Sequence, residues 1–414
     1  MNKKRNLVLL VALCTGTFIW GQTSNTGMLT ILPDTEVSVL DNLENTSVAT
    51  IYNDGQFYLS GNTINEGDWT YSLNTGTTHF VGQVDQFSTG SQMYELYHTV
   101  FDMSGDSPEV IVDATWSLNG NSNFINGVVQ NRSAGGIVVF EIGATHNGAS
   151  NTSFIDGTVL KSGGEGFDYP IGHLQYHRNA EITGTGNTAD LISATYFLEN
   201  SNDIHPHDLA VGVIEFIDDK EYWVVDPLEG GGDLVFLTLG WNDETTAQEL
   251  LESPSSIHIV RWDTNLGLWV DEGGVVDQNR GTVTTISEVS GYGMFTLAKV
   301  KKEEVLAKGL VVYNSVTPNQ DGTNDFFFID GISEYPDNEL VIFNRWGTKV
   351  YETKGYNETD NVFQGFSQVP STYRAEEKLP AGTYFYVLRY RYEDEDGTSK
   401  MEKRAGYLYI NAND

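Results

Sequence analysis

Residues 49–62, ATIYNDGQFYLSGN, carry the pattern that decides the fold of the first part of the chain. Two short apolar segments, 49–51 and 57–59, are separated by an Asn-Asp-Gly turn and followed by a Gly-Asn pair. A loose repeat of this kind returns about every 20 residues, a length typical of solenoids. Phenylalanines stand near its strand positions: Phe57, Phe80, Phe124, Phe140 and Phe154. We therefore predict a parallel β-helix over residues 22–165, with Asn and Gly at corners that need a positive φ; an antiparallel sandwich with many hairpins is the alternative.

Residues 166–300 contain longer alternating segments, separated by turn residues at intervals typical of a sandwich. These segments are 209–217, 221–225, 234–239, 257–262, 281–286 and 294–299. We predict a β-sandwich for this middle part. Its tryptophans are interpreted as core anchors, with a platform for stacking sugars as the alternative: Trp223, Trp241, Trp262 and Trp269.

Composition narrows the class of protein. The 414 residues include 12% aromatics, which excludes wholesale disorder, and carry a formal charge of −34. This charge argues against nucleic acid or an anionic membrane surface as a partner. Residues 22–300 hold 38 acidic against 7 basic side chains, a net of −31, whereas residues 301–414 hold 19 against 13, a net of −6. The break falls in a charged segment, 301–309, which we interpret as a linker.

The first 21 residues have the features of a signal peptide. Lys3, Lys4 and Arg5 form a basic start, and the apolar segment 7–20 is too short to span a bilayer. We expect cleavage near Gln22 and export of the remaining chain.

The last part, 310–414, is rich in strand signals. Residues 340–343 and 349–352 flank the turn Asn344-Arg345-Trp346-Gly347 and predict a hairpin. Residues 384–392 alternate between an aromatic face and a face that becomes partly cationic. The segment 406–410 is expected to close the fold almost at the end of the chain.

These residues resemble a known family, the gliding-motility-associated C-terminal domain, which is the type B sorting domain of type IX secretion. The matching motifs follow one another in order: 312–314, 317–325, Phe327, 331–332, 335–336, 340–347, 350–352, 355–356, 379–386 and 406–410. Two positions depart from the family pattern, Gln320 in place of a glycine and Phe363-Gln364 in place of a tryptophan. The resemblance covers about the last 105 residues.

The resemblance implies an Ig-like β-sandwich that acts as an export tag. The type IX translocon would select it, and an outer-membrane barrel of the PorP/SprF type would retain the cargo at the cell surface. A folded tag needs an exposed patch for its partner, and Arg and Trp are favoured at such sites. The candidate partner-binding residues are Asn344, Arg345, Trp346, Gly347, Gly382, Thr383, Tyr384, Phe385 and Tyr386. The alternative is that Trp346 and the tyrosines fill the core of the sandwich.

Two groups of side chains have the chemistry of metal ligands. Asn319, Asp321 and Asp325 place oxygen atoms in one tight loop, as Ca²⁺ prefers; the alternative is an Asx-rich turn that starts the domain. The histidine pairs 173/177 and 205/207 have strand spacing, and we interpret them as solvated side chains rather than a transition-metal site. No other cofactor is expected.

The chain carries few signals of catalysis. Lyase chemistry needs a cation or base beside the abstracted proton, and residues 22–165 contain Arg132 and Lys161 as their only Lys or Arg. The sequence also lacks G-x-S-x-G and H-E-x-x-H. We therefore expect a non-enzymatic adhesin or accessory of gliding and surface attachment, with a surface glycan or substratum as its partner. A secreted polysaccharide-degrading enzyme with the same tag is the alternative.

Overall fold

The computed structural model describes residues 22–210, 214–229, 234–300, 304–305, 310–318, 325–344, 347–368, 378–393 and 399–410. The predicted signal peptide, residues 1–21, lies outside this set. The protein is all-β, as predicted, with 52% of the described residues in strands. No helix among the described residues is long and apolar enough to cross a membrane.

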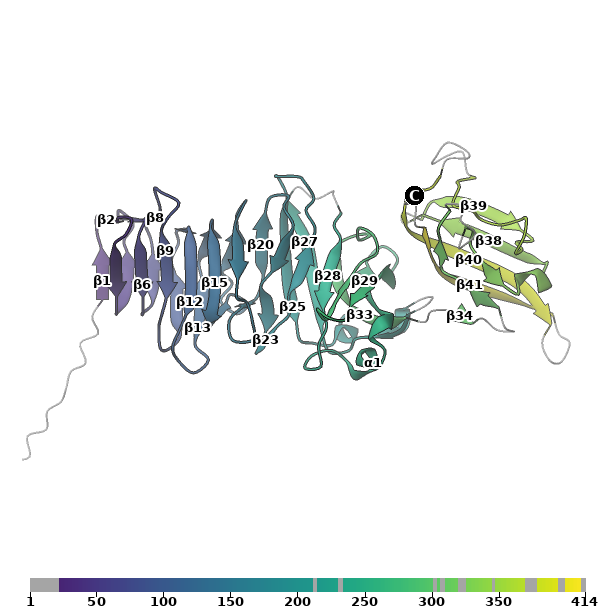
Figure 1. Ribbon diagram of the computed structural model, residues 1–414, viewed down its shortest axis with the longest axis horizontal. Helices are drawn as coiled ribbons and strands as arrows, with labels where there is room; N and C mark the ends of the chain where they lie inside the picture. The colour runs from purple at the N-terminus through teal and green to yellow at the C-terminus, as the bar shows by residue number, and fades with distance from the viewer. Residues whose placement is uncertain are drawn as a thin grey trace, which may run out of the picture.

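The N-terminal part is a parallel β-solenoid of about seven turns, which confirms the predicted β-helix (Figure 1). The first six turns each contribute one strand to each of three sheets, and later strands continue the first two sheets only. The first sheet contains β1 (Gln22–Asn25), β4 (Asn42–Asn45), β7 (Thr63–Asn65), β10 (Gln86–Thr89), β13 (Glu109–Asp113), β16 (Val128–Gln130), β19 (Ile155–Asp156) and β22 (Ile171–His173), with the short β23 (Tyr176–His177) antiparallel at its end. The second contains β2 (Met28–Ile31), β5 (Thr50–Asn53), β8 (Asp68–Thr70), β11 (Tyr94–Leu96), β14 (Thr115–Leu118), β17 (Ile137–Phe140) and β20 (Val159–Ser162). The third contains β3 (Glu36–Val39), β6 (Gln56–Leu59), β9 (Thr77–Phe80), β12 (His98–Asp102), β15 (Asn121–Asn126) and β18 (Thr145–Asn147).

Aromatic side chains fill the solenoid from one turn to the next. All five phenylalanines of the predicted repeat are buried. Phe101 stacks between Phe80 and Phe124, with ring centroids 5.4 and 5.0 Å apart. Glycine is needed where one turn passes closely over another: Gly90 has φ +125°, and a Cβ there would lie 2.1 Å from the Asn65 carbonyl oxygen. The repeat period therefore follows from stacked aromatics and tight corners.

A ladder of asparagines closes one corner of the first three turns. The Nδ2 of Asn25 donates to the Oδ1 of Asn45 (2.9 Å), and the Nδ2 of Asn45 donates to the Oδ1 of Asn65 (2.8 Å). The same Nδ2 of Asn45 also reaches the carbonyl oxygen of Asp68 at 2.9 Å. Asn45 and Asn65 are fully buried, so the ladder supplies the hydrogen bonds that buried amides and corner carbonyls require.

The middle part is an antiparallel sandwich that continues directly from the solenoid. Strand β20 pairs antiparallel with β25, so the second sheet runs on into the middle part. The added strands are β25 (Leu191–Phe197), β27 (Tyr222–Glu229), β33 (Gly293–Val300), β29 (Ile257–Asp263), β30 (Leu268–Gly273) and β26 (Ile214–Ile217). The facing sheet contains β21 (Phe167–Tyr169), β24 (Ala180–Ile182), β28 (Leu237–Gly240), β32 (Thr282–Thr284) and β31 (Val275–Asp277). Short helical turns connect them: η1 (Ser201–Asp203), η2 (His207–Leu209), α1 (Gln248–Leu251) and η3 (Pro254–Ser256).

One hydrophobic core runs through the solenoid and the sandwich, from Ile31 to Leu297. The pairing changes from parallel to antiparallel close to the boundary at 165/166, but the core is not interrupted there. The division of this region into two domains at 165/166 stays a prediction.

The C-terminal part has a core of its own, which extends from Leu310 to Ile410. One sheet contains β34 (Glu304–Val305), β35 (Val311–Val312) and β37 (Ile329–Asp330), followed by the turn η5 (Ile332–Glu334). The other has the order β36 (Ser315–Val316), β41 (Ser399–Ile410), β40 (Gly382–Glu393), β38 (Asn338–Phe343) and β39 (Lys349–Lys354). Strand β34 lies within the segment 301–309 that was interpreted as a linker. Strand β41 closes the five-stranded sheet between β40 and β36, as expected of 406–410.

Candidate functional site

The candidate strand 382–386 forms the start of β40 and points its side chains to two sides. Tyr384 and Tyr386 are buried in the C-terminal core, and the hydroxyl of Tyr384 donates to the carbonyl oxygen of Pro380 at 2.9 Å. Thr383 and Phe385 alternate with them and are half-buried on the outer face of the sheet. Gly382 begins the strand with φ +146°. A partner that contacts this strand directly would therefore meet its outward side chains, Thr383 and Phe385.

The candidate turn 344–347 joins β38 to β39. The Asn344 side chain is buried, and its Oδ1 accepts a hydrogen bond from the amide of Thr348 at 2.9 Å. Gly347 is exposed with φ +73° and donates its amide to the carbonyl oxygen of Asn344. Arg345 and Trp346 lie outside the described residues. Asn344 thus shapes the turn, whereas a role of the turn in binding stays a prediction.

The residue before the candidate turn lies beside the candidate strand on the outer face of the five-stranded sheet. Phe343, directly before the turn, is the register partner of Phe385, and Phe385 is the partner of Tyr407. We call these three side chains the apolar stripe. A row of charged residues, Glu339, Arg389 and Lys403, lies further along the same three strands. Along β40, the outer face therefore changes from aromatic at Phe385 to charged at Arg389. The alternation of residues 384–392 predicted that this face becomes partly cationic.

The predicted metal ligands are not gathered into a site among the described residues. Asn319 and Asp321 lie outside the described residues, so the calcium prediction stays open. Among the described residues, no group of three or more His, Cys, Asp or Glu side chains could hold a metal ion.

The four histidines are not gathered around one point, although the rings of His205 and His207 both lie against Trp269, with ring centroids 6.3 and 5.7 Å from it. The Nδ1 of His173 accepts the amide of Leu198 at 3.1 Å, and burial lowers the pKa of His177 to about 4. His205 stacks on Trp262 with ring centroids 4.2 Å apart. The Nε2 of His207 lies 2.8 Å from the hydroxyl oxygen of Ser201, at the edge of a cavity of about 510 Å³.

The tryptophans of the middle part divide into two kinds. Trp223 and Trp269 are fully buried core residues. Trp241 and Trp262 are half-buried, and the His205 ring covers a face of Trp262. Trp223 and Trp269 are therefore core anchors, because a fully buried ring presents no face on which a sugar could stack.

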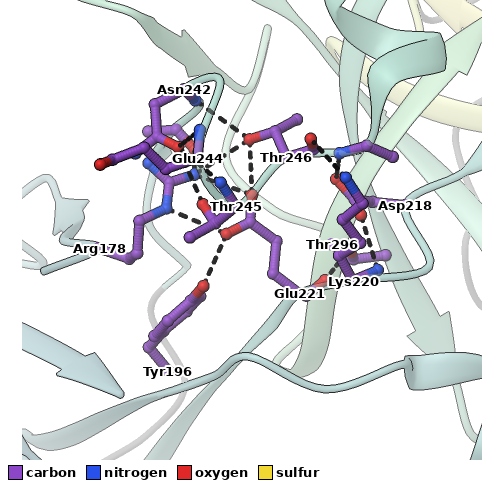
Figure 2. A network of polar contacts seen from close by, with 12 residues as sticks. Arg178, Tyr196, Asp218, Lys220, Glu221, Asn242, Glu244, Thr245, Thr246 and Thr296 are labelled. Carbon is purple, nitrogen blue, oxygen red and sulfur yellow. Dashed lines mark hydrogen bonds and ion pairs between the residues drawn. The ribbon is translucent and has the colours of Figure 1, made fainter. Parts of the chain in front are cut away.

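A buried polar network joins the end of the solenoid to both sheets of the sandwich (Figure 2). Arg178 forms a bidentate ion pair with Glu221, with Nε–Oε2 and Nη2–Oε1 distances of 3.0 and 2.9 Å. The hydroxyls of Tyr196 and Thr246 also donate to the Glu221 carboxylate, at 2.8 and 2.7 Å. The Nη2 of Arg178 further reaches the carbonyl oxygen of Gly240 at 2.7 Å. Because the side chains of both ions are almost fully buried, these bonds must replace their lost hydration.

Burial and Glu221 act differently on the pKa values of Arg178 and Asp218 in this network. Burial alone would lower the pKa of Arg178, but Glu221 raises it above its usual value. Burial, together with the nearby Glu221, raises the pKa of Asp218 to about 7, although the backbone amides of Ala247 and Lys220 donate to its oxygens. The network links strands rather than opening into a cleft, and we interpret it as structural.

Sequence reasoning did not find this network. Its available signal was the scarcity of cations, because residues 22–300 contain only seven Lys and Arg. Four of these seven form ion pairs with little exposure of the basic side chain: Arg132 with Asp156, Lys161 with Glu165, Arg178 with Glu221, and Arg261 with Asp263 and Glu272. The small number of Lys and Arg residues in this acidic part could therefore have indicated that most of them form internal ion pairs.

The outer face of the third solenoid sheet carries a regular row of side chains. The row runs across six strands in register: Ser38, Tyr58, His79, Val100, Asn123 and Asn147. The rings of Tyr58 and His79 stack 4.2 Å apart, and the Nδ2 of Asn147 donates to the Oδ1 of Asn123 at 2.7 Å. Burial lowers the pKa of His79, although Asp102 and Glu36 oppose this effect. The row is therefore uncharged at neutral pH, and we call it the neutral row.

Outward carboxylates occur on all three sheets. Glu44, Glu109 and Asp113 lie on the first sheet, and Asp68 and Glu95 lie on the second. The third sheet carries two, Glu36 in β3 and Asp102 at the end of β12. The neutral row itself contains no carboxylate, so it is an uncharged line across this face of the solenoid.

The C-terminal β-sandwich has a core of its own, and the outer face of its five-stranded sheet carries the apolar stripe beside a charged row. Residues 310–410 match the CHU_C type IX secretion signal domain, which confirms the suspected family for about a quarter of the chain. No curated protein and no solved structure significantly matches the chain. The C-terminal part is a type IX secretion signal domain, and it directs export across the outer membrane to the cell surface or beyond.

Proposed function

We propose that this exported protein is a non-enzymatic adhesin, or an accessory of gliding and surface attachment, whose solenoid binds an uncharged polysaccharide. An outer-membrane barrel of the PorP/SprF type is the proposed partner that retains it on the cell. The observation that carries the proposal is the neutral row on the third sheet.

The neutral row suits an extended polymer. Neighbouring strands of a sheet lie about 4.8 Å apart, so six strands present matched side chains over roughly 24 Å. Asn123, Asn147 and Ser38 offer amide and hydroxyl groups to sugar hydroxyls, and Tyr58 offers the edge of an aromatic ring. Binding an uncharged ligand on a neutral surface removes no ion from water, although the whole chain carries a net charge of −34.

The two cations considered for lyase chemistry are engaged inside the fold. The Nε of Arg132 lies 2.6 Å from Asp156, and its Nη2 donates to the carbonyl oxygen of Tyr196 at 2.7 Å. Lys161 is buried, and its Nζ donates to Glu165 at 2.8 Å. Both contacts favour a structural role for these residues and support the adhesin over the polysaccharide-degrading enzyme.

A sedimentation assay with insoluble polysaccharides tests the proposal. The purified chain, residues 22–414, is mixed with cellulose or chitin and, in parallel, with anionic pectate gel. We expect binding to a neutral polymer, a loss of about tenfold in affinity for the double variant His79→Glu/Asn123→Glu, and no release of reducing ends.

The matched control is Thr89→Glu/Gln130→Glu, which adds the same charge to outward positions of the first sheet. Equal losses in both double variants would argue against the neutral row as the binding surface. Release of reducing ends from either neutral polymer would favour the enzyme.

A further inference from the structure

The passenger, residues 22–300, covers one end of the apolar stripe on the sorting domain. Val270 of β30 and Val300 of β33 form a small buried cluster with Tyr407, which is only 3% exposed. Phe385 packs against this cluster, and its ring lies 6.0 Å from that of Tyr407. The cluster is separate from the two main cores.

A hydrogen bond accompanies this apolar contact. The hydroxyl of Tyr409 donates to the carbonyl oxygen of Ile286 at 3.1 Å. Tyr409 lies on the same outer face as Tyr407, two residues along β41. The sorting domain therefore meets its own passenger through the outer face of β40 and β41.

The stripe extends beyond this contact. Phe343, at its far end, is half-buried and belongs to neither the C-terminal core nor the passenger cluster. Val387 is also half-buried on the outer face of β40, where its register partners are Val341 and Ala405. An apolar surface that is only partly covered by its neighbour is a common sign of a second binding partner.

We infer that the apolar stripe is the surface through which a component of the export machinery binds the sorting domain, and that the passenger occupies one end of that stripe in the folded chain. This inference rests on the export function of the domain. The partner it fits is a protein surface with an apolar centre bordered by carboxylates.

The chemistry of the bordering residues specifies this partner. Arg389 and Lys403 lie with Glu339 in the row beside the apolar residues, and Arg391 follows on the same face of β40. Arg389 pairs with Glu339 at 2.8 Å and Arg391 with Asp337 at 2.6 Å, so these three cations exceed the two carboxylates by one positive charge. The passenger shows the apolar part of this character, because its contact residues in the cluster, Val270 and Val300, are aliphatic. Complementary charge around an apolar centre sets orientation and partner choice.

Surface display of the full chain tests the inference. Phe385→Glu places a carboxylate in the centre of the stripe while leaving the buried tyrosines of β40 intact. We expect display at the cell surface to fall about tenfold or more, as for loss of a central aromatic contact, with unchanged melting of the purified chain. Val387→Glu is a second variant on the same face, should Phe385→Glu fail to fold.

The matched control is Phe366→Glu, at a phenylalanine of the same domain that is 39% exposed and lies outside the stripe. Display of a folded Phe385→Glu protein at the rate of this control would overturn the inference. If deletion of residues 310–410 also left display unchanged, the export function itself would be wrong; if deletion blocked display, only the assignment of the stripe would fail.

The passenger side of the contact is tested separately. Val270→Glu should release the sorting domain, so that small-angle scattering shows a longer maximum dimension, while display is retained or accelerated because the stripe becomes fully accessible. Loss of display in Val270→Glu, with a folded passenger, would show that the docked arrangement is the one required, and would overturn the inference.

Discussion

Asp218 is a carboxylate whose buried position makes its ionisation unfavourable. It accepts backbone amides from Lys220 and Ala247 within the network of Figure 2, yet burial and Glu221 raise its pKa to about 7. The folded chain therefore binds this proton more tightly than the unfolded chain, whose Asp pKa is about 3.9. The stability gained from this proton is complete below about pH 4 and is lost as the pH rises through 7.

Asp218→Asn should remove this part of the pH dependence. We expect the unfolding free energy of the native sequence, relative to that of the variant, to fall by up to roughly 4 kcal/mol between pH 4 and pH 8. Urea unfolding at a series of pH values measures the difference, and other titrating groups cancel because both proteins contain them. Parallel pH profiles would contradict the raised pKa.

The asparagine ladder holds the first turns of the solenoid through hydrogen bonds along the stack. Asn45→Ala would remove the partner of the Asn65 Oδ1 and of the Asp68 carbonyl oxygen, and it would leave the Nδ2 of Asn25 with its bond to the Thr50 carbonyl oxygen alone. Unpaired buried polar groups cost about 1–3 kcal/mol each, partly relieved by water, so we expect a loss of roughly 2–4 kcal/mol in the unfolding free energy.

Chemical denaturation compares this variant with Asn147→Ala, an exposed asparagine of the third sheet. The exposed change should cost less than about 0.5 kcal/mol. A similar loss at both positions would show that the inner ladder contributes no more than a surface amide.

Local patterns predicted the elements better than their connections. The solenoid period could be inferred because corner glycines and strand phenylalanines recur within each turn, as at Gly90 and Phe80. The continuation of the second sheet could not, because it depends on β20 pairing with β25, where Lys161 is the partner of Ile192. Such a pairing leaves no local periodic signal.

The two faces of the candidate binding strand could be predicted from the sequence, but its neighbours in the sheet could not. Alternation in 384–392 separated two faces, but the tyrosines placed on the candidate list turned inward, because large aromatic side chains gain most from burial. The neighbouring position of Phe343 and Phe385 depends on strand register, which alternation alone does not fix.

At the level of the whole molecule, export and the proposed ligand binding belong to parts with separate cores. Deletion of residues 310–410 should leave the passenger folded, since its core ends at Leu297, but trapped in the periplasm. Cell fractionation and protease accessibility on intact cells measure this. Normal surface exposure of the shortened chain would refute export by this domain.

The unbroken second sheet has a mechanical consequence for a protein tethered at its C-terminal end. Its strands are stacked along the long axis from the first turn to the sandwich (Figure 1), so their hydrogen bonds point along that axis. Tension between a tether at one end and a ligand held near the other would stretch these bonds in series. We expect such a chain to lengthen turn by turn under load, because the hydrogen bonds between turns break one after another. A sandwich pulled along its strands would instead lose many hydrogen bonds at once.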